Sequence, residues 1–231
     1  YAEAEELGRQ MLEICRRVLG AEHTDTIASM NNLANSLRHK GRYAEAETLH
    51  RQTLEIRRRV LGEEHPDTLD TMYNLANILD DQGRYVEGEE LHRQTLEIQR
   101  RVRGEEHPHT LGSMNNLAVT IRNQGRYAEA EELFWRTLGI RRRVLGAEHP
   151  STLASVTNLA VVLDDQGRYA EAEQLYRQGL EIRRRVLGAE HPHMLGSMNE
   201  LANCLQYQGR YAEAEELYRQ TLESRIRVQG A

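Results

Sequence analysis

The stretch "GRYAEAETLHRQTLEIRRRVLGEEHPDT", residues 41–68, recurs almost unchanged along the chain and governs its fold. Close copies begin at Gly83, Gly125, Gly167 and Gly209, so four consecutive intervals of 42 residues pass without an insertion or a deletion. A fixed period of this length is typical of a solenoid, in which each unit packs only on its neighbours. The repeat therefore predicts that the chain works through the array and not through a single enclosed pocket.

The composition of the 231 residues allows a thin, elongated core. Charged residues make up 29% and hydrophobic residues 39%. No run approaches the roughly 18 consecutive apolar residues that a membrane-spanning helix requires, which predicts no membrane association. The formal net charge of -6 argues against nucleic acid as the main partner. The sequence starts at Tyr1, inside the repeated motif, and we expect it to be a piece of a longer protein.

The two cysteines, Cys15 and Cys204, occupy different positions of the repeat. They therefore form no disulfide framework, and the sequence predicts free thiols in a reducing compartment. We expect a cytoplasmic location for this reason.

Each unit predicts two α-helices and no strand. The first begins at Tyr43, places its apolar side chains on one stripe with 3.6-residue periodicity, and ends at Gly62. Pro66 suits the first position of the second helix, which ends before Gly83. Because only two residues connect this helix to the next one, neighbouring helices must run antiparallel. The whole chain then contains about eleven helices, alternately about 18 and 16 residues long.

The spacing of small and large residues across a helix pair resembles the tetratricopeptide repeat. In that repeat a small residue directly follows a Leu. A large apolar residue stands three positions after this small residue and a second small residue stands twelve positions after it, and an aromatic residue follows the second small residue by four positions. The unit of this chain exceeds the usual length of about 34 residues, because "LEIRRRVLGEEHP" lengthens the Tyr-started helix. This longer unit is similar to the repeats of kinesin light chains and of some fungal and bacterial signalling proteins. The matching positions are Leu75, Ala76, Leu79, Gly88 and His92, with Ala130 and Phe134, Ala172 and Tyr176, and Ala214 and Tyr218 in later copies.

The resemblance implies a right-handed superhelical α-solenoid of antiparallel helix pairs. We name the Pro-started helix of each unit A and the Tyr-started helix B. Residues 1–231 would form a single repeat domain, with a half repeat at residues 1–20. The resemblance further implies a scaffold for protein–protein interactions, which binds an extended or helical peptide in a concave groove lined by the A helices. The units are expected to begin near residues 21, 63, 105, 147 and 189.

Comparison of the units with one another separates constant from variable positions. Every copy carries the same residue at the positions of Tyr43, Val60, Leu75 and Ala76. The pattern predicts that these side chains lie on buried stripes, where each unit meets an identical neighbour.

Two polar features are equally constant, namely the position of Arg59 and the pair Glu64-His65. We expect them to bridge a loop and the next helix. A basic stripe formed by the Arg runs is the alternative, and it would suit a phosphate-rich partner.

The variable positions of the A helices share one face, at about 80–180° from the Leu-Ala stripe when each residue turns by about 100°. In tetratricopeptide proteins this face lines the groove, so variation there is typical of a recognition surface. The alternative is that exposed positions simply drift. The predicted groove residues are Asn31, Asn32, Asn35, Arg38, Tyr73, Asn74, Asn77, Asp80, Asn115, Asn116, Arg122, Thr157, Asn158, Asp164, Asn199, Glu200 and Asn203.

One row within this face consists of Asn32, Asn74, Asn116 and Asn158, and ends at Glu200. A side-chain amide both donates and accepts, so the row could hold the backbone of an extended peptide without reading its sequence. It could equally well join adjacent A helices. The sequence leaves the two possibilities open.

Catalytic, cofactor and metal sites are not expected. The His and Glu residues recur along the array instead of converging, and no nucleophile–base set, phosphate-binding Gly-rich loop or Cys-x-x-Cys spacing is present. The "HPH" stretches at residues 107–109 and 191–193 supply two imidazoles without a third ligand. The sequence thus predicts a chain that is not an enzyme and uses no cofactor.

Self-assembly is the alternative function. A solenoid normally ends in units with a polar outer face, whereas this chain begins and ends on B helices that keep their apolar stripes. We therefore expect weak homo-association through the terminal helices. The candidate contact residues are Tyr211, Ala214, Leu217, Tyr218 and Leu222.

Overall fold

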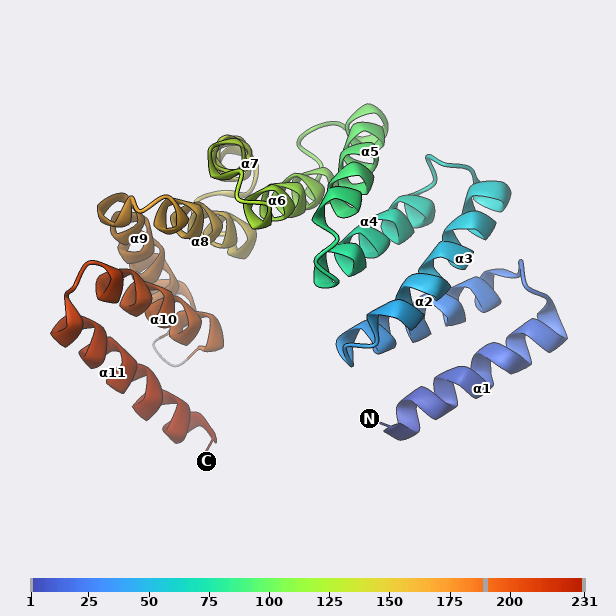
Figure 1. The fold of residues 1–231 in the computed structure, drawn as a ribbon, viewed down its shortest axis with the longest axis horizontal. Helices are drawn as coiled ribbons and strands as arrows, with labels where there is room; N and C mark the ends of the chain where they lie inside the picture. Colours follow the sequence, from blue (N-terminus) through green and yellow to red (C-terminus); the bar gives the residue numbers. More distant parts are fainter. Residues whose placement is uncertain (1, 189–190, 230–231) are drawn as a thin grey trace. The chain divides into compact units, whose positions relative to one another are not determined.

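The computed structural model describes residues 2–188 and 191–229, and the side chains of residues 6–188 and 191–227. The described residues form eleven α-helices and no strand, which confirms the predicted all-α class (Figure 1). Even-numbered helices are A helices and odd-numbered ones are B helices. The helices are α1 (Ala2–Leu19), α2 (Thr24–His39), α3 (Tyr43–Leu61), α4 (Pro66–Asp81), α5 (Tyr85–Arg103), α6 (Pro108–Asn123), α7 (Tyr127–Leu145), α8 (Pro150–Asp165), α9 (Tyr169–Leu187), α10 (Pro192–Tyr207) and α11 (Tyr211–Gln229).

The chain divides into two compact units, Tyr1–Thr120 and Ile121–Ala231. In the first unit α1 to α5 pack in chain order, each on the helix before and after it, and in the second unit α7 to α11 do the same. The A helices α2 and α4 also touch, as do α8 and α10. This sequential packing is the arrangement of an α-solenoid.

Local chemistry sets the start of each A helix. The His65 side chain caps α4, because its Nδ1 accepts a hydrogen bond from the Asp67 backbone N–H at 3.2 Å. Pro66 occupies the first turn, where a missing N–H costs nothing. The Thr68 hydroxyl, which is buried, donates to the Gly62 carbonyl at 2.8 Å and so ties the loop to the preceding helix. His149 caps α8 in the same way.

Each A helix ends at a glycine with positive φ. The Gly83 N–H donates to the Asp80 carbonyl and the Arg84 N–H to the Leu79 carbonyl, both at 2.9 Å. This pair of bonds is a Schellman-type ending, in which φ of 75° at Gly83 suits the residue without a Cβ. The chain can therefore reverse direction within two residues.

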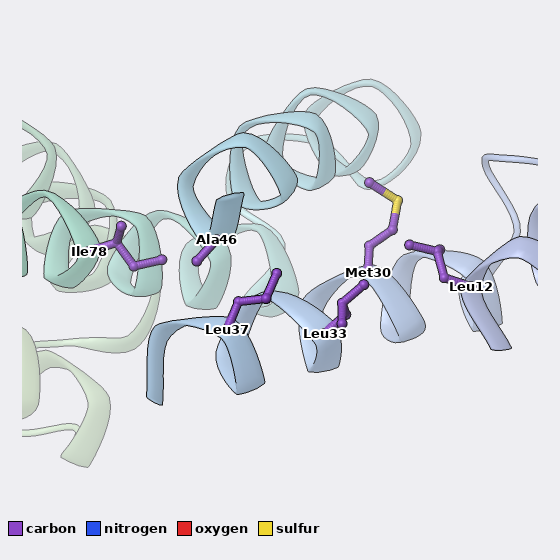
Figure 2. Packing of buried hydrophobic residues seen from close by; sticks show 6 residues of the cluster. All are labelled: Leu12, Met30, Leu33, Leu37, Ala46 and Ile78. Atoms are coloured by element: carbon purple, nitrogen blue, oxygen red, sulfur yellow. The ribbon is translucent and has the colours of Figure 1, made fainter. Parts of the chain in front are cut away.

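The core of the first unit is a layer between neighbouring helices. Leu12 of α1 and Ile78 of α4 lie at the two ends of one cluster, which α2 and α3 fill from between (Figure 2). The Ala of each Leu-Ala pair is fully buried, and a side chain of this size lets two helices approach closely. The cluster comprises Leu12, Met30, Leu33, Leu37, Ala46 and Ile78.

The prediction that the constant Val lies on a buried stripe is wrong. Val60 is 46% exposed and its equivalents between Val18 and Val186 lie between 43% and 68%. The B helix α3 has 19 residues and the A helix α4 only 16, so the last turn of the B helix extends beyond its partner. The Val in that turn has no A helix to cover it.

The expected bridge between loops and helices is present. Arg59 pairs with Glu22 at 2.5 Å and Arg101 with Glu64 at the same distance, so each Arg contacts the loop of the preceding unit. These side chains are more than half exposed, and an exposed ion pair stabilises a fold by only about 0–1 kcal/mol. The bridge fixes geometry more than it adds stability.

Candidate functional site

The predicted groove face of the first unit is crossed by hydrogen bonds between neighbouring A helices. Arg38 of α2 pairs with Asp81 of α4 at 2.5 Å. The Asn116 amide of α6 donates to the Tyr73 hydroxyl at 2.8 Å and to the Asn77 carbonyl oxygen at 2.7 Å, both on α4. Asn116 therefore joins adjacent A helices. Of the two roles that the sequence left open for the Asn row, this residue has the structural one and does not point to a peptide role.

Asp80 is the centre of a second polar cluster on α4. One carboxylate oxygen accepts from the Thr120 hydroxyl at 2.6 Å and lies 3.2 Å from His92 Nε2. The other oxygen is buried and has no hydrogen-bond partner among the described residues. Gly88 makes room for this carboxylate, since a Cβ at residue 88 would come within 2.2 Å of it.

The second unit has a counterpart of this cluster around Asp164 of α8. Burial raises the pKa of the Asp164 carboxyl, and it also raises the pKa of the Cys204 thiol to about 12, with a further contribution from Asp164. Cys15 and Cys204 are both free and buried, which confirms the predicted free thiols. A thiol with so high a pKa is a poor nucleophile.

Buried arginines link the B helices α3 and α7 to the A helices that follow them. Arg57 Nη1 donates to the Asp67 carbonyl and to the Thr71 hydroxyl, both at 2.6 Å. Arg141 repeats the arrangement with the Ser151 carbonyl at 3.0 Å and the Ser155 hydroxyl at 2.6 Å. Burial lowers the pKa of Arg57, against the opposing effect of nearby carboxylates, but the guanidinium stays charged at any physiological pH.

A cavity of about 590 Å3 opens in the first unit where this arrangement is interrupted. Its wall includes the predicted groove residues Asn31, Tyr73 and Asn74. Gln99 of α5 lines the same cavity at the position that Arg57 holds one repeat earlier. The cavity therefore lies where the predicted groove face meets the repeat position that holds a buried arginine in α3 and α7 (Arg57 and Arg141), here called the buried arginine row.

The other lining groups are residues that the sequence did not single out as part of the groove. Asp70 on α4, together with His109 and Ser113 on α6, completes the wall. The carboxylate of Asp70 lies 3.7 Å from the His109 ring. A signal for this site was visible in the sequence, because Gln99 breaks the Arg of the "IRRRV" run.

The remaining predicted groove residues hold varied positions. Asn32 is exposed, whereas Asn74, Asn199 and Glu200 are half-buried. Some side chains are engaged within their own unit, among them Asn35 with His50, Thr157 with Arg183, Arg122 with Asp165, and Asn203 with Tyr218. Asn115 and Asn158 also make contacts within the protein.

His50, beside Asn35, is a buried imidazole on α3. Burial lowers its pKa to about 4, with smaller contributions from Arg57 and Arg38. The ring is therefore neutral in the folded chain at neutral pH, and it serves as a core side chain at the aromatic position of the repeat.

The terminal helices expose apolar side chains. Tyr211 and Leu222 of α11 are exposed, Leu217 and Tyr218 are half-buried, and Ala214 is buried against the rest of the unit. At the other end of the chain, α1 exposes a row of large apolar residues at helical spacing, namely Leu7, Met11, Ile14 and Val18.

Two kinds of site are missing from the described part of the chain. No group of three or more His, Cys, Asp and Glu residues there could hold a metal ion. Across residues 2–188 and 191–229, no helix has both the length and the apolar character needed to cross a bilayer.

Solved structures share this architecture. Kinesin-light-chain-like, nearly identical TPR-like repeats from Podosopora anserina are 33% identical over 90% of this chain and 99% of that chain, with a TM-score of 0.75. A Gln-to-Met variant of those repeats is 34% identical over 89% and 97% of the two chains, with a TM-score of 0.77. BtubC (BKLC) from P. vanneervenii has the same fold, with a TM-score of 0.80 at 20% identity over 98% of this chain and 91% of that one.

The sequence itself matches a known family over nearly its whole length. The family described as Tetratricopeptide repeat matches residues 25–87, 71–134, 110–185 and 153–227, and a second model with the same description matches residues 1–25. Comparison with curated proteins finds no significant match. The repeated helix pairs, the constant Leu-Ala contacts and these matches agree, and the chain belongs to the tetratricopeptide repeat family in its kinesin-light-chain-like form.

Proposed function

We propose that the chain is a scaffold that binds an extended or helical peptide along the groove face of its A helices. Tetratricopeptide repeats are generally protein-interaction scaffolds and are typically not enzymes. In this chain the ligand would lie on the groove face of the A helices. The partner is a protein or peptide, without nucleic acid, membrane or cofactor.

The observation that carries the proposal is the polar cavity beside α4. Repeat-to-repeat variation concentrates on the A-helix face. Asn31 and Tyr73, which share one variable position of the repeat, line this cavity together with Asn74 of the Asn row. The Asn31 side-chain oxygen is buried without a hydrogen-bond partner among the described residues. An unpaired buried acceptor is costly, and a bound peptide N–H would satisfy it.

Neighbouring positions in the Asn row provide a matched test. Peptides selected from a displayed library on the 231-residue chain are measured by fluorescence anisotropy against two variants. Asn74→Ala is expected to weaken binding roughly five-fold, or about 1 kcal/mol, without a change in melting, because it removes one amide from the groove. Asn116→Ala is expected to lower stability by about 1 kcal/mol, because this amide joins α6 to α4.

The reverse result would contradict the proposal. If Asn74→Ala lowers the melting temperature while peptide affinity holds, the Asn row is structural throughout the first unit. A library that yields no peptide above the background of an unfolded control also argues against a groove ligand.

Self-association through the terminal B helices is a second candidate function. The exposed apolar row on α1 favours it, since Leu7 is 61% exposed and Met11 is 56% exposed. A single row of this size is too small for a tight interface, so the association should be weak and concentration-dependent.

Sedimentation at increasing concentration tests this second candidate. The double variant Met11→Glu and Tyr211→Glu is expected to shift the chain toward monomer, because charge on the apolar rows opposes their burial. Gln10→Glu, on the same helix, is the matched control and should leave the sedimentation profile unchanged. A strict monomer at every concentration, or a double variant that associates as the parent does, excludes self-association through these rows.

A further inference from the structure

The cavity beside α4 coincides with a break in the buried arginine row. In the preceding repeat the Arg57 guanidinium reaches the Thr71 hydroxyl at 2.6 Å, and in the following one Arg141 reaches the Ser155 hydroxyl at 2.6 Å. The equivalent positions, 42 residues after Arg57 and Thr71, hold Gln99 and Ser113, and both line the cavity. An amide is shorter than a guanidinium and carries no charge, so residue 99 supplies no cation to Ser113.

Within the described part of the chain, position 99 and its neighbour Ser113 carry buried polar atoms without a hydrogen-bond partner. The Gln99 side-chain oxygen and the Ser113 hydroxyl have no hydrogen-bond partner among the described residues, although Gln99 is 1% exposed and Ser113 fully buried. Both residues line the cavity. Buried polar atoms of this kind cost free energy unless a partner satisfies them.

The charges around the cavity favour a cation. Asp70 contributes a carboxylate at a position where every other repeat has Ala or Gly, and Asp67 adds a second one. Against these stand the His109 ring and the Arg57 guanidinium, which is already bonded to the Asp67 carbonyl and to Thr71. The two carboxylates thus face a single guanidinium, which is already engaged.

We propose that this cavity binds the guanidinium group of an arginine side chain in the bound peptide. The ligand group then takes the place that Arg57 and Arg141 fill in their own repeats, with Ser113 and Gln99 as acceptors and Asp70 as the counter-charge. A planar guanidinium with several donors fits such a set of acceptors better than the compact, strongly hydrated ammonium of lysine. That the guanidinium belongs to an arginine of a bound peptide rests on the proposed function. That the cavity prefers a guanidinium does not depend on it.

Titration of the 231-residue chain with capped amino acids isolates the cavity from the rest of the groove. Nα-acetyl-arginine amide is compared with the lysine and citrulline analogues by calorimetry or by amide chemical shifts of α4 to α6. The arginine compound is expected to bind about ten-fold more tightly than either analogue. The urea group of citrulline is planar like a guanidinium but carries no charge, whereas the ammonium group of lysine is charged but not planar.

Gln99→Arg is the decisive variant, because it fills the cavity from within as Arg57 and Arg141 do in their repeats. It is expected to weaken binding of the arginine compound by about ten-fold or more while melting is unchanged or higher. Gln94→Arg places the same charge on the exposed face of α5 and should change the affinity less than about two-fold. Asp70→Ala, which restores the residue of the first and fourth A helices, should weaken binding about three- to ten-fold.

Some outcomes would overturn the inference. Equal affinities for the arginine and citrulline compounds exclude a guanidinium site, and so does unchanged binding by Gln99→Arg. If Gln99→Arg fails to fold, Ser113→Ala answers the same question, since removal of this acceptor must also weaken arginine binding and spare the weaker lysine binding.

Peptides separate this inference from the proposed function. If library peptides bind the groove but tolerate replacement of each arginine by citrulline, the scaffold proposal stands and the arginine site fails. If the arginine compound binds and loses affinity in Gln99→Arg, yet no library peptide is retained, the site stands and the peptide-scaffold proposal fails.

Discussion

Replacing Phe134 with Ala is expected to lower the free energy of unfolding of the second unit by about 3–5 kcal/mol. Phe134 is the chain's only phenylalanine and lies on α7 with no exposed surface. It occupies the aromatic position of the repeat, which His50, His92 and Tyr176 fill in other B helices. Truncation removes the apolar contacts of the ring and leaves a cavity that rigid neighbouring helices can only partly close.

The next residue provides the control. Trp135 follows Phe134 on the same helix but is 46% exposed, so Trp135→Ala should change stability by no more than about 1 kcal/mol. Urea unfolding followed by far-UV circular dichroism measures both variants. Equal losses for the two aromatic residues would show that the burial assigned to α7 is incorrect.

Replacing Gly146 with Ala is expected to destabilise the second unit by about 1–3 kcal/mol, although the new methyl group touches nothing. Gly146 ends α7 with φ of 89° and ψ of 163°, a conformation that residues with a Cβ rarely adopt. No atom lies within 4 Å of the position of an added Cβ. The cost therefore comes from the backbone of the residue itself.

Gly139, in the middle of the same helix, is the matched control. An added Cβ there also meets nothing within 4 Å, but the backbone is helical. Gly139→Ala should therefore stabilise the unit by about 0.5–1 kcal/mol, because Ala favours helix and Gly loses more conformational entropy on folding. Thermal melting compares the two variants, and shifts of the same sign would refute the conformational explanation.

Much of the fold could be predicted because its signals are local. His65 and Pro66 start α4 through contacts within three residues, and Gly83 ends it through bonds to the last turn. The period of 42 residues then carries this local structure through the chain. Helix number, helix type and antiparallel order all follow from interactions that a short window of sequence contains.

The candidate site was predicted only in part. The variable A-helix face led to Asn31, Tyr73 and Asn74, which line the cavity. Gln99 and Ser113 were not proposed, although Gln99 stands out within its arginine run. Its importance depends on Arg57 and Arg141 being buried and bonded to the following A helix, and a helical wheel does not show which of three consecutive arginines turns inward.

Residues far apart in the sequence owe their roles to stacking alone. Asn116 meets Tyr73 and Asn77 across 39–43 residues, so whether its amide faces a ligand or another helix depends on how closely α4 and α6 approach. Val60 repeats as faithfully as a core residue yet is exposed, because the longer B helix runs past its shorter partner. The sequence of one unit determines the local hydrogen bonds and the helical periodicity. The burial of a side chain and its hydrogen-bond partner are decided only when neighbouring units pack.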